Sequence, residues 1–168
     1  VWNIESNGWF LTNMKTESGA EFDGFGIGGS FTKDDLPTAV RAVTESLPEN
    51  KPRHLLGIGE PLDILDAVAV GCDTFDCIIP TRHARHGSVF TKNGRLNLMN
   101  EKHITDFTPI ESDCECSTCK RFTKAYLSHL ARSKEMLAAT LASVHNIYFL
   151  EKLMSDIRTA IEDERFEE

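Results

Sequence analysis

Two apolar segments, HLLGIG at residues 54–59 and TFDCIIP at residues 74–80, indicate the fold class together with the residues between them. Apolar side chains recur at helical spacing from Pro61 to Val70, and Gly71 then ends the segment. A strand, a helix and a second strand in this order predict a parallel β/α unit. Strands of such units are usually buried on both faces.

The same alternation extends towards the N-terminus. FDGFGIGG at residues 22–29 predicts a strand that runs into a turn. Residues 34–47 follow with acids in the first turn and apolar residues at helical spacing, and Pro48 ends them. Residues 1–20 show no clear period and predict an irregular lead-in.

The second half of the chain predicts a different arrangement. Residues 91–113 read as a loop with short extended pieces. From Tyr126 to Ile161 apolar residues recur at steps of three, four and seven, which predicts two helices or one long kinked helix. The fold class is therefore α/β, and its three β/α units are too few to close a barrel, so they belong to a larger sheet or to a fragment.

Three cysteines lie within six residues, Cys114, Cys116 and Cys119, and His145 follows 26 positions later. Three thiolates and one imidazole can fill the four tetrahedral positions of a structural zinc ion and leave no position for water. The sequence predicts one such zinc per chain, held by these four residues. The alternative is three unremarkable cytosolic cysteines and a histidine that is satisfied in a core.

Composition narrows the possible settings of the protein. An odd count of five cysteines, three of them clustered, argues against a secreted disulfide framework and favours the cytoplasm. No segment predicts a signal peptide or a membrane span. The net charge is −8, yet residues 82–134 hold ten Lys or Arg against five Asp or Glu. That basic zone is either a footprint for a phosphate backbone or a solvated surface.

Asp76 is a candidate for chemistry because it stands in an otherwise apolar strand, where an unpaired carboxylate is costly. It is either hydrogen-bonded for structural reasons or projects from the carboxyl end of the strand, where β/α folds keep catalytic groups. A basic loop, PTRHARHG at residues 80–87, comes directly after it. Arg82 and Arg85 in this loop could bind phosphates near the carboxylate.

Four motifs together carry a resemblance to a known family: Gly28-Gly29, LGIG at residues 56–59, GCDTFDCIIPTR at residues 71–82, and the C-x-C-x2-C…H set. From about Phe22 to the end, the chain resembles the C-terminal half of tRNA-guanine transglycosylase, or queuine tRNA-ribosyltransferase, of the bacterial and eukaryotic type. The resemblance implies the last three or so units of a TIM (β/α)8 barrel in residues 21–110. A zinc-binding subdomain with C-terminal helices follows in residues 111–168.

The resemblance also implies an activity. The family exchanges guanine at the wobble position of a tRNA anticodon loop for a 7-deazaguanine, preQ1 or queuine, and the full-length protein is expected to dimerise. On this match Asp76 is the nucleophile that attacks ribose C1′, and Arg82 and Arg85 contact the tRNA. The positions that match base-binding residues are Gly28, Gly29, Ser30, Leu56 and Gly57.

Two departures lead to alternatives. Ser30 stands where the family usually has leucine, and no residue here supplies the acid–base aspartate that the family carries in its first half. We therefore expect a fragment or a truncated product that is inactive alone. A non-catalytic zinc-containing accessory subunit is a second hypothesis, although it would not need a carboxylate at Asp76. A zinc module without a role in tRNA binding is a third, which the basic zone disfavours.

Overall fold

The computed structural model describes residues 2–5, 8–11, 22–29 and 36–166. The chain divides into two compact units, Val1–Cys77 and Ile78–Glu168, and each is described by itself. No helix within the described ranges is long and apolar enough to cross a lipid bilayer.

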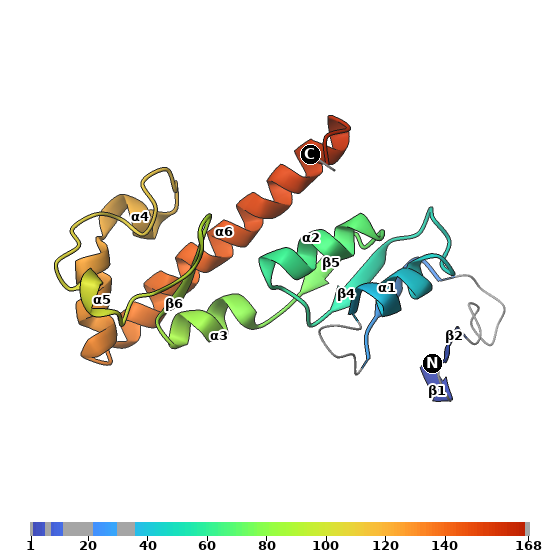
Figure 1. Cartoon of the computed structure of the whole chain (residues 1–168), viewed down its shortest axis with the longest axis horizontal. Coiled ribbons are helices and arrows are strands. Elements are labelled where there is room, and N and C mark those ends of the chain that lie inside the picture. Colours follow the sequence, from blue (N-terminus) through green and yellow to red (C-terminus); the bar gives the residue numbers. More distant parts are fainter. Residues whose placement is uncertain (1, 6–7, 12–21, 30–35, 167–168) are drawn as a thin grey trace. The chain divides into compact units, whose positions relative to one another are not determined.

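The first unit contains the predicted strand–helix alternation (Figure 1). Strands β3 (Phe25–Ile27), β4 (Arg53–Leu56) and β5 (Thr74–Asp76) form a parallel sheet in the order β3-β4-β5. Helix α1 (Leu36–Thr44) connects β3 to β4, and α2 (Pro61–Ala69) connects β4 to β5. The alternation of parallel strands and helices confirms the α/β class.

The core of the first unit lies on one face of this sheet. Ile27 and Leu55, from neighbouring strands, are almost fully buried and pack with apolar residues of the two helices. On the strands, by contrast, Leu56 and Asp76 are exposed. The prediction that these strands are buried on both faces is therefore wrong for the part of the chain that the structure describes.

Two further differences concern the ends of the first unit. Strand β5 stops at Asp76 and does not continue to Pro80, because Pro80 lies in the first turn of a helix, where a missing N–H costs nothing. At the other end, residues with no clear period form an antiparallel pair, β1 (Trp2–Glu5) with β2 (Gly8–Leu11).

The second unit is mainly helical. It contains α3 (Ile79–Arg85), the hairpin of β6 (Ser88–Thr91) and β7 (Gly94–Asn97), a 3₁₀ turn at Glu101–His103, α4 (Ser117–Arg121), α5 (Lys124–Arg132) and α6 (Met136–Glu162). Helix α6 is the long orange-to-red helix of Figure 1. Separate α5 and α6 confirm the two-helix alternative. The shared core is formed by Ala84, Val89, Leu98, Ile110, Cys116, Cys119, Leu127 and Ala142.

This core joins residues on both sides of position 110. Ala84 and Val89 pack in the same cluster as Cys116 and Cys119. The boundary between the observed units therefore follows Cys77 in the chain. The sequence-based division into a barrel part and a zinc subdomain places its boundary between residues 110 and 111. That division of the intact protein stays a prediction.

Candidate functional site

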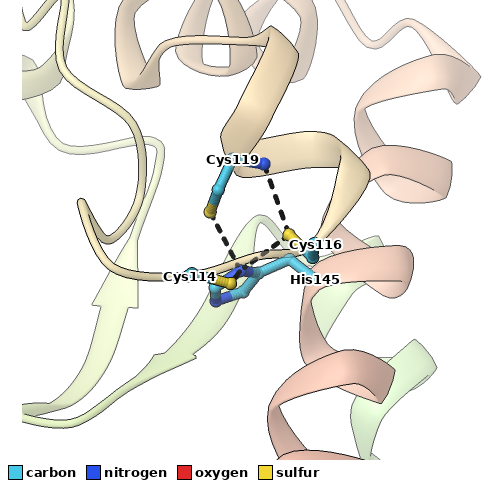
Figure 2. Close-up of side chains that lie close together, drawn as sticks. All are labelled: Cys114, Cys116, Cys119 and His145. Carbon is cyan, nitrogen blue, oxygen red and sulfur yellow. Dashed lines mark hydrogen bonds between the residues drawn. The ribbon is translucent and has the colours of Figure 1, made fainter.

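The three cysteines and His145 converge in the second unit. Cys114 and Cys116 precede α4, Cys119 lies in its first turns, and His145 comes from α6. Cys116 caps α4, since its sulfur accepts a hydrogen bond from the backbone N–H of Cys119 at 3.3 Å. Figure 2 shows the three sulfur atoms gathered around the imidazole.

The distances in this cluster fit a tetrahedral metal ion. The Nδ1 atom of His145 lies 3.7 Å from the sulfur of Cys114, 3.6 Å from that of Cys116 and 3.3 Å from that of Cys119. All four ligand atoms lie within 4.8 Å of one another. With metal–sulfur and metal–nitrogen bonds of about 2.3 and 2.0 Å, a tetrahedral angle separates sulfur from nitrogen by about 3.5 Å. The donor set is thus positioned to bind a metal ion.

The second ring nitrogen of His145 fixes its tautomer. Nε2 donates to the backbone carbonyl of Phe90 at 2.8 Å, which leaves the lone pair of Nδ1 directed at the sulfurs. His145 is fully buried, and burial lowers its pKa, so the ring is held in the neutral form that binds metals. A histidine oriented in this way is the arrangement expected of a ligand.

Burial also raises the pKa of the thiols of Cys114 and Cys119. Without a cation, these buried sulfurs would stay protonated, because the interior disfavours an isolated thiolate. A divalent cation reverses this preference, since it stabilises the thiolate directly. The chemistry of the donor set therefore fits a resident metal.

A second group of predicted residues meets at the sheet of the first unit. Because β3, β4 and β5 are parallel, their carboxyl ends lie at the same end of the sheet, and the register pairs Leu56 with Asp76. Gly28 follows β3 at this end of the sheet, and Gly57 follows β4. The structure thus brings Asp76 together with base-binding candidates from two other strands.

Asp76 is exposed at 61% of its side chain, and one of its oxygens is held in place. Oδ1 accepts hydrogen bonds from Nε2 of His54 at 3.1 Å and from the backbone N–H of Gly57 at 3.2 Å. Gly57 has a φ of +74°, in the left-handed region that favours glycine. The carboxylate of Asp76 is therefore both oriented and accessible, as a nucleophile requires.

His54 is a contributor that the sequence did not single out. Its Nδ1 lies 2.8 Å from the hydroxyl of Thr74, which can donate to it and leave the ring proton on Nε2 for Asp76. The signal was available, because His54 and Leu56 alternate onto the face of β4 that meets Thr74 and Asp76 of β5.

Leu56 lies across Gly28. A methyl group placed on Gly28 would come within 2.9 Å of Cδ1 of Leu56, and the Leu56 side chain itself is half exposed. Gly29 is exposed at the same end of the sheet, after β3. Ser30 lies outside the described residues.

Arg82 and Arg85 lie on helix α3, not in the loop that the sequence predicted. Pro80 lies in the first turn of the helix, and Pro80 and Ala84 are buried on one side, so both arginines are directed to solvent on the other. They belong to the second unit, whereas Asp76 belongs to the first.

The sequence also missed Asn146, the residue after His145. Its side chain is fully buried and makes three hydrogen bonds to the backbone of α3 and β6. Its position next to His145 is the only sequence signal that could have drawn attention to it.

Comparison with known proteins agrees with the motifs. Residues 11–168 match the family model described as queuine tRNA-ribosyltransferase. A queuine tRNA-ribosyltransferase of Clostridium acetobutylicum is 46% identical over 161 residues, which cover 94% of this chain and 43% of that protein. The enzyme of Vibrio atlanticus is 46% identical over 150 residues, 88% of this chain and 40% of that protein.

The relative from Clostridium tetani is 47% identical over 93% of this chain and 42% of its own length. The chain thus spans about two fifths of the length of the curated relatives that it matches. Nearly all of it is covered by these matches, and the chain belongs to the queuine tRNA-ribosyltransferase family.

Proposed function

We propose that this chain forms the nucleophile- and metal-bearing part of a tRNA-guanine transglycosylase. The observation that supports it most is the oriented, solvent-accessible carboxylate of Asp76 at the carboxyl end of the strands of a parallel sheet, in a chain of this family. Residues 21–110 would supply the last three or so units of a (β/α)8 barrel. Residues 111–168 would supply its metal subdomain and C-terminal helices.

The reaction we assign is a double displacement at ribose C1′ of the tRNA. Oδ2 of Asp76 attacks C1′, the C1′–N9 bond breaks, and guanine leaves with the bonding electrons. The departing guanine takes up a proton, the incoming 7-deazaguanine gives up its N9 proton as N9 attacks C1′, and the bond to Asp76 breaks. Two inversions retain the configuration, and the ester intermediate preserves the glycosidic bond energy, so no ATP is needed.

The neighbours of Asp76 have separate roles in this proposal. His54 and the N–H of Gly57 both donate to Oδ1, so they orient the carboxylate and leave Oδ2 directed to the substrate. Leu56 would pack on the flipped base, while Gly28, Gly29, Ser30 and Gly57 would let it approach the backbone.

We assign zinc to the cysteine–histidine site, since three thiolates and one imidazole are typical of structural zinc. Four protein ligands leave no open position, so the ion would stabilise the fold and take no part in base exchange. Arg82 and Arg85 would bind phosphates of the anticodon loop from the solvent face of α3. We place the intact protein in the cytoplasm, as a dimer.

The direct test uses a chimera in which this chain replaces the matching segment of the Clostridium acetobutylicum relative. Exchange of labelled guanine into tRNA is measured for the chimera and for its Asp76→Asn variant. We expect exchange by the chimera and a loss of at least about a thousand-fold in Asp76→Asn, because an amide is a poor nucleophile. Asp66→Asn, an exposed acid on α2, is the matched control and should leave exchange unchanged.

An active chimera that keeps its rate in Asp76→Asn would refute the assigned nucleophile. If the chimera binds tRNA and zinc but never exchanges guanine, the accessory-subunit hypothesis would replace the enzyme.

A further inference from the structure

We propose that Asn146 is a positioning residue that connects the metal centre to the arginine helix α3. Through it, the order of the segment that carries Arg82 and Arg85 depends on a metal bound further along the chain, by residues between Cys114 and His145. This inference adds a role to the site of the proposed function, but its test needs neither tRNA nor catalysis.

His145 and Asn146 are consecutive on α6, and both are fully buried. Between them they satisfy both backbone groups of a single residue, Phe90. Nε2 of His145 donates to the carbonyl of Phe90 at 2.8 Å, and Oδ1 of Asn146 accepts from its N–H at 2.9 Å. The two side chains therefore fix the position of α6 against β6.

The strand geometry explains why these backbone groups face α6. Phe90 and Ser88 are two residues apart on β6, so they direct their N–H and C=O groups to the same edge. The carbonyl of Ser88 at this edge accepts a bond of 3.1 Å from Nδ2 of Asn146. The Asn146 amide thus takes the place of a neighbouring strand, and it satisfies groups whose burial without a partner would be costly.

The same Nδ2 atom also donates to the carbonyl of Pro80 at 2.9 Å. Pro80 is the second residue of α3, two positions before Arg82 and five before Arg85. One amide therefore joins the first turn of α3 to the strand that His145 contacts. A metal held by His145 fixes the position of α6, and Asn146 transmits this constraint to α3.

The test measures hydrogen exchange at the α3 backbone amides of the full chain, loaded with zinc and after chelation. Asn146→Asp keeps the acceptor and the shape but removes both donors, whereas Asn146→Leu removes the donors and the acceptor without adding a charge. In zinc-loaded protein we expect at least about ten-fold faster exchange at residues 82–85 in both variants, with the zinc content unchanged. Chelation should accelerate the same amides in the unsubstituted protein.

Thr118→Val is the matched control. Thr118 is also fully buried in this unit, and its hydroxyl donates to the carbonyl of Leu141 at 2.7 Å, but none of its hydrogen bonds goes to α3. Its α3 amides should exchange as in the unsubstituted protein.

Three results would overturn the proposal. The first is unchanged α3 exchange in zinc-loaded Asn146→Asp and Asn146→Leu, and the second is equal acceleration in Thr118→Val. The third is loss of zinc in both variants, which would make Asn146 a support of the metal site alone. If chelation unfolds the whole unit, the comparison of zinc-loaded variants decides. If the chimera does not exchange guanine while the α3 amides respond to Asn146 and to zinc as expected, the proposed function fails and this inference stands.

Discussion

At the scale of single residues, the contact of Leu56 with Gly28 shows that the proposed base-binding site leaves no space for a side chain at Gly28. A methyl group on Gly28 would lie 2.9 Å from Cδ1 and 3.4 Å from Cβ of Leu56. The same change at Gly26 would place it 3.7 Å from Cδ1, an ordinary contact. These two glycines therefore form a matched pair.

We expect Gly28→Ala to displace the Leu56 side chain, lower the free energy of unfolding by about 1 kcal/mol, and raise the KM for the base in the chimera. Gly26→Ala should have a smaller effect on both. Chemical denaturation and steady-state kinetics measure these quantities. The double variant Gly28→Ala/Leu56→Ala should recover the stability lost through the clash, and equal effects of the two single alanines would contradict the contact.

At the scale of elements, the sequence predicted the β/α alternation of the first unit correctly, because helical spacing and glycine or proline boundaries are local signals. It extended β5 too far because Ile78 and Ile79 look like a strand, although Pro80 can begin a helix. It missed the hairpin of β6 and β7, whose two-residue loop, Lys92 and Asn93, is followed by Gly94 at a φ of +98°. An Asn-Gly pair is a turn signal that could have found it.

The candidate site was predictable in part, as the secondary structure was. The metal ligands and Asp76 have sequence signals of their own, in the cysteine spacing and in a carboxylate among apolar letters. His54 and Asn146 have only weak signals, strand alternation and the position next to His145, because each acts through a partner brought close by the fold. Their roles depend on strand register and helix packing, which local patterns do not determine.

Asp106 stabilises the start of α5. Its Oδ1 accepts hydrogen bonds from the N–H and hydroxyl of Thr108 at 3.1 and 2.6 Å, and its Oδ2 forms an ion pair with Lys124 at 2.8 Å. Oδ2 also lies 3.6 Å from Nδ1 of His103. The bonds to Lys124 and Thr108 hold the pKa of Asp106 well below its usual range.

A pKa lowered by folding means that Asp106 contributes stability above its unfolded pKa of about 3.9, and that this contribution is lost as the pH falls through the folded value. We expect Asp106→Asn to reduce the free energy of unfolding by about 1 kcal/mol at pH 7, since solvent screens a partly exposed pair. The difference should shrink below about pH 4. Denaturation at several pH values measures it.

Asp113→Asn, which breaks the exposed pair with Lys92, is the control and should change stability much less. A difference between Asp106→Asn and the unsubstituted protein that persists undiminished at pH 2 would contradict the ionic origin.

At the scale of the whole molecule, the chain consists of two compact units with separate cores. Two residues of the candidate metal site, Cys116 and Cys119, belong to the core of the second unit, and no residue of this cluster lies in the first. A metal bound there would therefore stabilise one unit directly.

We expect a chelator to expose amides of Ile78–Glu168 to hydrogen exchange while α1 and α2 keep their protection, because metal binding is coupled to folding only where the ligands lie. Cys119→Ser should reproduce this pattern without chelator, and Cys72→Ser, in the other core, should not. Equal loss of protection in both units on chelation would show that they unfold together.

We expect Asp76 to become covalently bound to ribose during exchange, and mass spectrometry of the trapped tRNA complex of the chimera can detect this bond. After denaturation and digestion with nuclease and protease, a ribose-linked adduct should be found on the peptide that contains Asp76, and none in Asp76→Asn. An adduct on another residue, or guanine exchange that continues in Asp76→Asn, would contradict it.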